Sequence, residues 1–388
     1  MTILCFFQFL YKFFIPWENV SAALLLNKTN KNTHNKKKRN WRKNMIQKDV
    51  QLTACIASCA TVVGKKEKEG PLGDLFDLHD PENKFGQKTW ETAEGEMQRR
   101  AFGLALSRLD KQDADVGALF AGDLQNQCVG SAYGLISYDI PYFGLYGACS
   151  TCAESLLLAA MTVSFGAFSL CGAVTSSHFC AAERQYRSPL EYGSQRPPTA
   201  QWTVTGAGAF LVGTAEDYPD AVRIVGGMPG KAQDYGINDA NNMGAAMAPA
   251  AAETVKRYFE ATNTAPSDYD RIITGDLGSE GGAILCELLR ADEIEISDRY
   301  GDCGQMIYDR KEQDVHGGGS GCGCSATVLA AYLLPKLQSG EWSRILFLAT
   351  GAMMSPDSIK QGGNIPAVAH LLELESPKIQ ESERRRHG

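Results

Sequence analysis

The apolar and polar positions around Cys149 predict a strand, a sharp turn and a helix. Residues 140–146 are mostly apolar and predict a buried strand, and residues 156–161 continue the pattern as a buried helix. Cys149 falls on the small-residue turn between them. The free backbone N–H groups of a helix N-terminus favour negative charge, so a thiolate or a bound carboxylate is stabilised there. Cys149 is therefore our first candidate site residue, and a buried structural cysteine is the alternative.

Strands and helices alternate along the rest of the chain. The pattern predicts strands at 56–64, 113–124, 168–178, 202–212 and 222–225, helices at 92–108, 125–136 and 250–261, a charged loop at 65–73 and a second loop at 239–249. This alternation predicts an α/β fold, in which binding sites form at the carboxyl ends of parallel strands. Alternate glycines within 202–212 predict close approach by another strand or by a ligand.

Three pairs of similar segments recur in the same order and indicate an internal duplication. Residues 114–124 and 267–277 both end in Gly-Asp-Leu, Ala159-Ala160 matches Ala330-Ala331, and the strand ending at 174–177 matches residues 345–351. The offset grows from 153 to 171 and then to about 175, as expected for two copies of a βαβ-type unit with insertions in the second.

The duplication predicts a domain organisation and a place for the site. We expect two α/β halves, residues 45–225 and 226–388, packed about a pseudo-twofold axis with central helices between the sheets. The helices after Cys149 and after Ser320 then occupy equivalent positions. A site at the axis would combine Cys149 with the glycine-rich loop His316-Gly317-Gly318-Gly319-Ser320-Gly321.

Charge divides the 388-residue chain into two unlike parts. Residues 1–44 hold nine Lys or Arg and one acidic residue, a net charge of +8, which leaves −15 for the other 344 residues. We expect residues 1–44 to be a non-globular extension, included because the translation start is assigned too far upstream, and we expect the working protein to begin at Met45. A membrane-surface tail is the alternative interpretation of residues 1–44. The acidic remainder has no basic face for nucleic acid and no segment suited to a transmembrane helix.

Twelve cysteines are spread along the chain, which is typical of reduced thiols. Cys149-x-x-Cys152 and Cys322-x-Cys324 do not make the four-ligand pattern of a structural zinc site. A thiol oxidoreductase that uses Cys149 and Cys152 is a weaker alternative, because the pair lacks the aromatic and proline context of a thioredoxin motif.

Short motifs from residue 50 to residue 375 resemble the thiolase superfamily of condensing enzymes, and within it a family of sporulation proteins from spore-forming bacteria. The motifs are Gly-Pro-Leu-Gly (70–73), Ala-Gly-Asp-Leu-x-Asn-Gln (121–127), Gly-Ala-Cys-Ser-Thr (147–151), Thr-Ser-Ser-His (175–178), Ala-Glu-Arg-Gln-Tyr-Arg (182–187), Thr-Val-Thr-Gly (203–206), Ala-Met-Ala-Pro-Ala-Ala (246–251), Asp-Cys-Gly-x-Met-Ile-Tyr (302–308) and Gly-Gly-Ser-Gly-Cys-Gly-Cys-Ser-Ala (318–326).

The resemblance implies a thiolase-like fold and a protein that binds dipicolinic acid or its calcium chelate. It implies a homodimer at the periphery of the inner membrane of the developing and dormant spore. There it would help a membrane channel, formed by sister proteins of the same operon, to load dipicolinate during sporulation and to release it on germination.

An active acyl-CoA or acyl-carrier condensing enzyme or acyltransferase is the alternative function. Cys149 would be its nucleophile, with His316 as the best candidate for the base. Only five His follow Met45, and the His-Pro-x-Gly and Asn-x-x-Gly-Gly loops typical of the superfamily do not occur. The catalytic set is therefore incomplete, and we expect binding rather than catalysis.

A planar dianion suits helix N-termini, glycine-loop amides and hydroxyl groups. Arg184 or Arg187 would clamp a carboxylate, with surface ion pairs as their alternative role. The only cofactor expected is calcium carried with the ligand, for which Asp123, Asp276 and Glu183 offer oxygen atoms, although the two Gly-Asp turns also suit helix caps. The predicted ligand-binding residues are Cys149, Ser150, Thr151, Thr175, Ser176, Ser177, His178, Glu183, Arg184, Gly318, Gly319 and Ser320.

Overall fold

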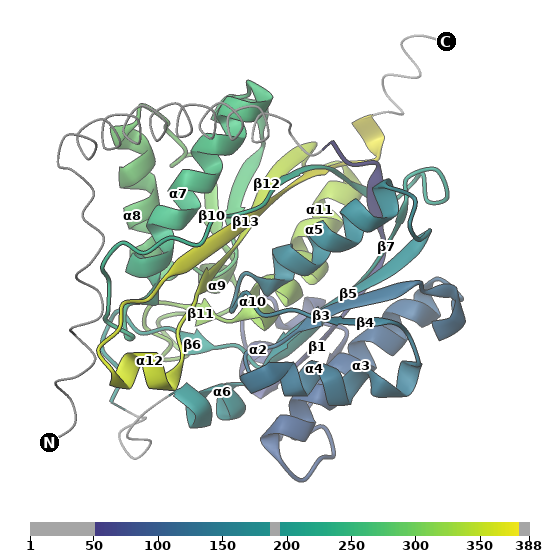
Figure 1. The fold of residues 1–388 in the computed structure, drawn as a ribbon, viewed down its shortest axis with the longest axis horizontal. Helices are drawn as coiled ribbons and strands as arrows, with labels where there is room; N and C mark the ends of the chain where they lie inside the picture. Colours follow the sequence, from purple (N-terminus) through teal and green to yellow (C-terminus); the bar gives the residue numbers. More distant parts are fainter. Residues whose placement is uncertain (1–50, 187–194, 380–388) are drawn as a thin grey trace, which may run out of the picture. The chain divides into compact units, whose positions relative to one another are not determined.

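Ten strands lie side by side in the computed structural model, which describes residues 51–186 and 195–379 (Figure 1). Their order is β10-β9-β12-β13-β8-β1-β7-β5-β3-β4, and the short β2 (Leu78–His79) pairs with β1. Of these ten strands, the first five along the chain are β1 (Ala54–Val63), β3 (Ala118–Gly122), β4 (Tyr142–Gly144), β5 (Leu170–Ser177) and β7 (Gly206–Thr214). The next five are β8 (Val222–Met228), β9 (Arg271–Thr274), β10 (Tyr300–Asp302), β12 (Arg344–Ala352) and β13 (Ala367–Glu375).

The strand order confirms the duplication. We number the strands of each set by their order in the chain. In both sets the strands then lie side by side in the order third, second, fourth, fifth, first, and the two sets meet where β1 pairs with β8. Residues 114–124 and 267–277 contain β3 and β9, which have equivalent places in the two sets. The second set begins at Val222, so strand β8 crosses the boundary expected at 225/226.

Helices cover both sets of strands and fill the space between them. Helices α3 (Trp90–Arg108) and α4 (Val129–Leu135) lie against the first set, and α7 (Met243–Thr262) and α8 (Gly278–Ala291) against the second (Figure 1). Between the sets lie α5 (Thr151–Ser164) and α10 (Cys322–Val328), the latter continuing through 329–333 into α11 (Leu334–Ser339). One cluster of buried residues joins β3, α5 and β12, so the halves share a core.

The alternate glycines of β7 face a helix. A Cβ atom added at Gly208 would lie 2.7 Å from the Cβ atom of Ala326 in α10, and one added at Gly206 would lie 2.9 Å from Cγ2 of Thr327. The sequence correctly predicted that another part of the structure comes close to these glycines, but that part is a helix rather than a strand or a ligand. These glycines let the central helix pack directly on the sheet.

Three predicted elements differ from the structure. The strand before Cys149 is not buried: β4 is three exposed residues at the edge of the sheet. Helix α7 begins seven residues before its predicted start, because Asn242 caps the backbone N–H of Ala245 and Pro249 removes only one helical donor. The charged loop at 65–73 contains the short helix α2 (Lys65–Lys68), which buries Glu67.

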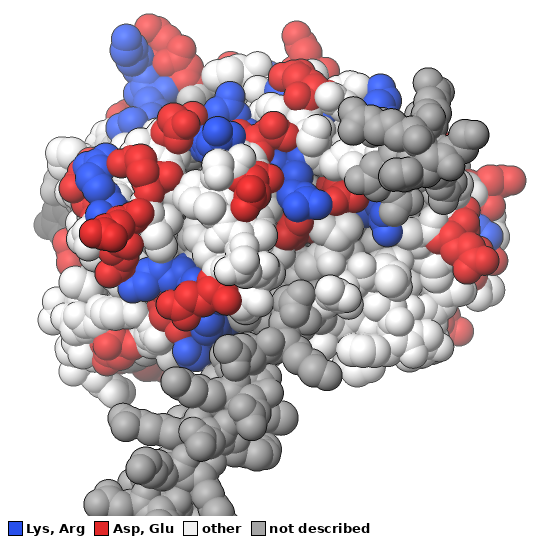
Figure 2. Space-filling view, turned by 90° about the horizontal axis from the view of Figure 1, so that it is seen from above, with Lys and Arg blue, Asp and Glu red and all other residues white. Residues whose placement is uncertain are grey.

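Acidic and basic side chains are interspersed on the face shown in Figure 2 rather than gathered by sign. Within the described ranges, none of the helices combines the length and the apolar composition needed to cross a bilayer. The predicted extension at 1–44 lies outside the described residues.

Candidate functional site

Cys149 lies on a tight turn between β4 and α5. Ala148 has φ +49°, a backbone conformation that is uncommon for a residue other than glycine. The hydroxyls of Ser150 and Thr151 hold this turn by donating to the carbonyls of Gly147 (2.6 Å) and Ala148 (2.7 Å). The turn therefore presents the Cys149 side chain at the start of α5, with only 5% of the residue exposed.

The glycine-rich loop of the second half lies opposite this turn, as the duplication predicted. Strand β11 (Gly319–Ser320) pairs in parallel with β6 (Trp202–Thr203), and positive φ angles at Gly318 and Gly321 shape the loop. The hydroxyl of Ser320 lies 3.9 Å from the sulfur of Cys149. The two residues are 171 positions apart, the offset of the second sequence repeat.

Asp276 is the buried acid behind this contact. Its carboxylate accepts hydrogen bonds from the Gly321 N–H (2.9 Å), the Thr350 hydroxyl (2.9 Å) and the Ser320 hydroxyl (3.3 Å). Burial raises its pKa from 3.8 to about 6. Between those pH values the native state holds the proton more tightly than the unfolded chain, so ionisation of Asp276 reduces stability as the pH rises through this window.

The Cys149 thiol is held in its neutral form. Burial raises its pKa well above the ordinary value, and the charge of Asp276, to which the thiol also hydrogen-bonds, raises it further. These two effects outweigh the helix N-terminus, which by itself stabilises a thiolate. The sequence, which predicts a stabilised thiolate or bound carboxylate at this helix N-terminus, shows neither the burial of Cys149 nor the carboxylate beside its sulfur, both of which raise the thiol pKa.

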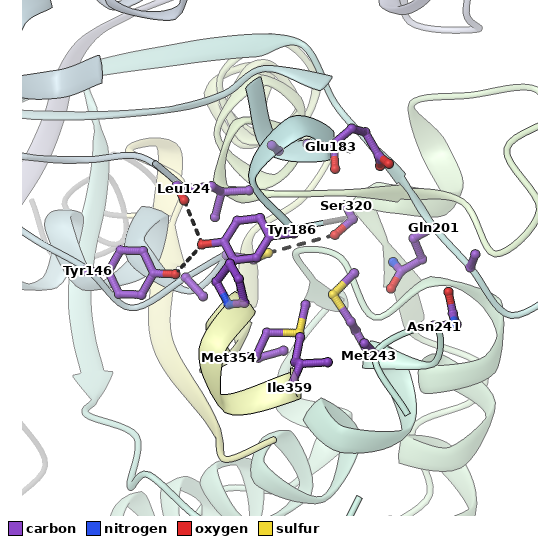
Figure 3. Close-up of a pocket in the computed structure, with 18 of the residues that line it drawn as sticks. Leu124, Tyr146, Glu183, Tyr186, Gln201, Asn241, Met243, Ser320, Met354 and Ile359 are labelled. Atoms are coloured by element: carbon purple, nitrogen blue, oxygen red, sulfur yellow. Dashed lines mark hydrogen bonds between the residues drawn. The ribbon is translucent and has the colours of Figure 1, made fainter. Parts of the chain in front are cut away.

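A pocket of about 350 Å³ opens beside Cys149 and Ser320 (Figure 3). It draws on both halves and on the segments that follow β5 and β12, namely α6 (Phe179–Tyr186) and α12 (Pro356–Lys360). Besides Cys149 and Ser320 it is lined by Leu124, Tyr146, Ala148, Ala182, Glu183, Tyr186, Ala200, Gln201, Thr203, Ala240, Asn241, Met243, Ala352, Met354, Pro356, Ile359 and Lys360.

The polar groups of the pocket lie on two sides of it. On one side the Tyr146 and Tyr186 hydroxyls are 2.7 Å apart, and Tyr186 donates to the carbonyl of Leu124 (Figure 3). On the other side the amide nitrogen of Gln201 donates to the carbonyls of Asp276 and Gly319. The buried Oε1 of Gln201 has no hydrogen-bond partner among the described residues.

Three of the predicted ligand-binding residues line the pocket: Cys149, Glu183 and Ser320. The other nine lie elsewhere in the described structure. Ser176 and Ser177 are buried in β5, where they bond to Glu94 (2.9 Å) and to the carbonyl of Val204 (2.7 Å). Thr175 is buried beside them, Ser150 and Thr151 hold the Cys149 turn, and Gly318 and Gly319 contribute backbone behind Ser320.

The remaining candidates make structural contacts away from the pocket. His178 is buried, with Nε2 2.8 Å from the carbonyl of Asn83, and His316 contacts the carbonyl of Pro197 (2.8 Å) and Asp314 (2.9 Å). Arg184 pairs with Glu91. Asp123 accepts from the backbone N–H groups of Gln125 and Ser131 and so stabilises its own turn. Arg187 lies outside the described residues.

Several lining residues were not predicted, above all Tyr146, Gln201, Met354, Ile359 and Lys360. The internal duplication could have predicted Met354, Ile359 and Lys360. Helix α6 follows β5, and α12 follows the equivalent strand β12, so the segment after residue 352 should line the pocket if the segment after residue 177 does. No cluster of three or more His, Cys, Asp or Glu suited to a metal ion occurs in the described ranges.

Comparison with known proteins identifies the family. The stage V sporulation protein AD family matches residues 46–375. This chain belongs to that family. It is 42% identical over 315 residues to stage V sporulation protein AD of Bacillus subtilis (strain 168), a match that covers 81% of this chain and 92% of the relative.

Solved structures show the same fold in condensing enzymes. 3-Oxoacyl-(acyl carrier protein) synthase III, FabH, from Xanthomonas oryzae pv. oryzae superposes with a TM-score of 0.53 and 15% identity, covering 83% of this chain and 99% of that one. Cerulenin-bound OleA from Xanthomonas campestris gives 0.55 and 14%, covering 84% and 98%. The fold is therefore thiolase-like.

The electrostatics of the site predict how Cys149 reacts with an alkylating reagent. Asp276→Asn removes a charge that raises the thiol pKa, so the pH–rate profile for alkylation of Cys149 by iodoacetamide should shift to lower pH. Mass spectrometry of the Cys149 peptide measures the rate. The half-buried Cys286 is the internal control, and an unchanged midpoint at Cys149 would show that Asp276 does not set its pKa.

Proposed function

We propose that this sporulation protein binds dipicolinic acid (pyridine-2,6-dicarboxylate) or its calcium chelate in the pocket at Cys149 and Ser320. In this role it serves the spore membrane channel formed by sister proteins of its operon. It loads dipicolinate during sporulation and acts in its release on germination, from the periphery of the inner spore membrane.

The lining of the pocket supports a small planar diacid as ligand. Its volume is within the range of small-molecule sites, and Met243, Met354 and Ile359 give it an apolar wall (Figure 3). Hydroxyl groups and the Lys360 ammonium are donors suited to carboxylates. The N-terminus of the 14-residue helix α5 points its positive dipole end at the same space.

Oxygen atoms on the opposite side support the calcium chelate. Calcium takes six to eight oxygen ligands, and the two carboxylates of dipicolinate leave part of that shell open. The unpartnered Oε1 of Gln201 and the side chains of Glu183 and Asn241 line the pocket and are oxygen donors of the right kind. A pocket with one carboxylate and one ammonium is suited to a chelate of low net charge.

Calorimetric titration with dipicolinate, with and without calcium, tests the proposal. We expect saturable binding that Cys149→Ala weakens less than Ser320→Trp, because the indole fills the pocket whereas the alanine only shortens a wall. Glu183→Gln should reduce the increase in dipicolinate affinity that calcium causes by about tenfold, while binding without calcium is retained. Absence of binding at millimolar ligand would refute the function; thermal melts of each variant control for folding.

We also propose that the protein forms a homodimer through the edge of its sheet. Strand β4 is the last strand of the sheet that the described residues form, and its outer edge pairs with none of them. Its Tyr142 and Phe143 are exposed, as is Tyr146 just beyond it. Phe143 is 51% exposed and stacks on Phe120 at 5.0 Å. An exposed aromatic edge strand is a template for pairing with a second copy.

Light scattering after size exclusion tests this dimer. Phe143→Glu should weaken self-association at least about tenfold, because it places a charge in the centre of the proposed contact. Phe165→Glu is the matched control, since Phe165 is 75% exposed at the end of α5 and is not part of the edge strand. Equal effects of the two substitutions, or a monomeric wild type, would exclude this interface.

The Cys149 turn also favours a second candidate function, acyl transfer. In that reaction the sulfur attacks the carbonyl of an acyl-CoA thioester, the C–S bond to CoA breaks, and the thiol proton leaves with CoA. Because the thiol is held neutral, we expect no acylation of Cys149 after incubation with acetyl-CoA. An acetylated Cys149 peptide that is absent in Cys149→Ser would favour the enzyme over the binding protein.

A further inference from the structure

One wall of the pocket is a strap that joins β12 to β13. It runs from Met353 to Pro366 and is closed at its base, where the Met353 N–H donates to the carbonyl of Pro366 (2.7 Å). The Ile365 N–H holds the same base to the carbonyl of Ile237 (2.7 Å). The side-chain amide of Asn364 also donates to the carboxylate of Asp234 (3.1 Å). All three attachments lie at the ends of the strap.

The middle of the strap is self-contained. Ser355 and Ser358 form a capping box at the start of α12, and the Gly363 N–H donates back to the carbonyl of Ser358 (2.9 Å). Gly362, with φ +73°, ends the helix. Within the described part of the chain, every hydrogen bond made by residues 355–363 stays inside the strap, and none of residues 353–364 is buried.

In the part of the chain that the structure describes, side-chain packing rather than hydrogen bonding holds the middle of the strap to the rest of the structure. Met354, Pro356, Ile359 and Lys360 line the pocket, and Figure 3 shows Met354 and Ile359 reaching into it from this segment. Segments with few buried contacts and no bonds to their surroundings open at low free-energy cost. A ligand in the pocket would add contacts to the strap that the empty pocket lacks.

Lys360 gives the strap its chemical specificity. It is the one cationic side chain among the described residues that line the pocket, and it makes no ion pair or hydrogen bond with any of them. Its exposed position leaves the flexible four-carbon stem free to turn inward. The ammonium is therefore available to a carboxylate of the ligand.

We propose that residues 353–366 form a lid that closes over a small carboxylate ligand, and that Lys360 is the lid residue that binds the carboxylate. This inference rests on the proposed function, because it concerns the same pocket. It adds a moving part and a specificity-determining residue to that site. Closure stabilises the bound state through Lys360, and opening releases the ligand.

Titration combined with hydrogen–deuterium exchange of the full-length protein tests the lid. With dipicolinate as the probe, we expect Lys360→Met to weaken binding about tenfold or more, the usual range for a lost charge-assisted hydrogen bond, and Lys360→Arg to stay close to wild type. Backbone amides of residues 354–363 should exchange more slowly in wild type when ligand is present. Lys311→Met, which replaces an exposed lysine whose ammonium has no hydrogen-bond or ion-pair partner among the described residues, should bind like wild type.

The two proposals fail in different ways. If wild type does not bind dipicolinate, the proposed function itself is refuted. If wild type binds but Lys360→Met binds equally well, or exchange at 354–363 does not change with ligand, the lid is refuted while the function stands. Melting temperatures within error of wild type for all three variants confirm that the differences arise in binding.

Discussion

One buried carboxylate, Asp276, lies where the Cys149 turn of the first half contacts the Ser320 loop of the second. It follows β9, yet it accepts hydrogen bonds from the loop before α10 and from Thr350 of β12, and it contacts the thiol of Cys149 in the other half. Hydrogen bonds to a charged acceptor contribute about 1.5–3 kcal/mol each, and a carboxylate that lost them would remain buried without partners. The turn at Cys149 and the loop at Ser320 are therefore held in register, and the floor of the pocket is a fixed surface.

The same carboxylate changes the chemistry expected at the helix N-terminus. A cysteine in that position, taken alone, is an activated nucleophile. Here burial and the neighbouring charge keep the thiol protonated. The two histidines predicted as site residues make other contacts, His178 with the carbonyl of Asn83 and His316 with Pro197 and Asp314. Cys149 thus lines the pocket as a protonated thiol beside Ser320.

Much of this arrangement could be predicted from the sequence, because duplication is visible in residue spacing. The offset of 171 placed Ser320 opposite Cys149 without any structural information. Hydrophobic periodicity also found α5 and β5, which are buried along their length. It failed for β4, where apolar residues face solvent at a sheet edge, and for the start of α7, where a capping Asn and small residues give little periodic signal. Side chains that reach the pocket from separate segments, such as Gln201 and Asn241, have no local pattern that would reveal them.

The duplicated architecture also explains why one wall of the pocket is fixed and the other is loosely held. Helix α6 and helix α12 follow equivalent strands, β5 and β12, and both line the pocket. Contacts to the body secure α6: Arg184 pairs with Glu91, Gln185 bonds to Asn126 and Leu124, and Tyr186 bonds to Tyr146. Helix α12 keeps its hydrogen bonds to itself. A pocket between two repeats needs an entrance. The weaker anchoring of α12 provides one, and its opening leaves the contacts of the Asp276 carboxylate in place.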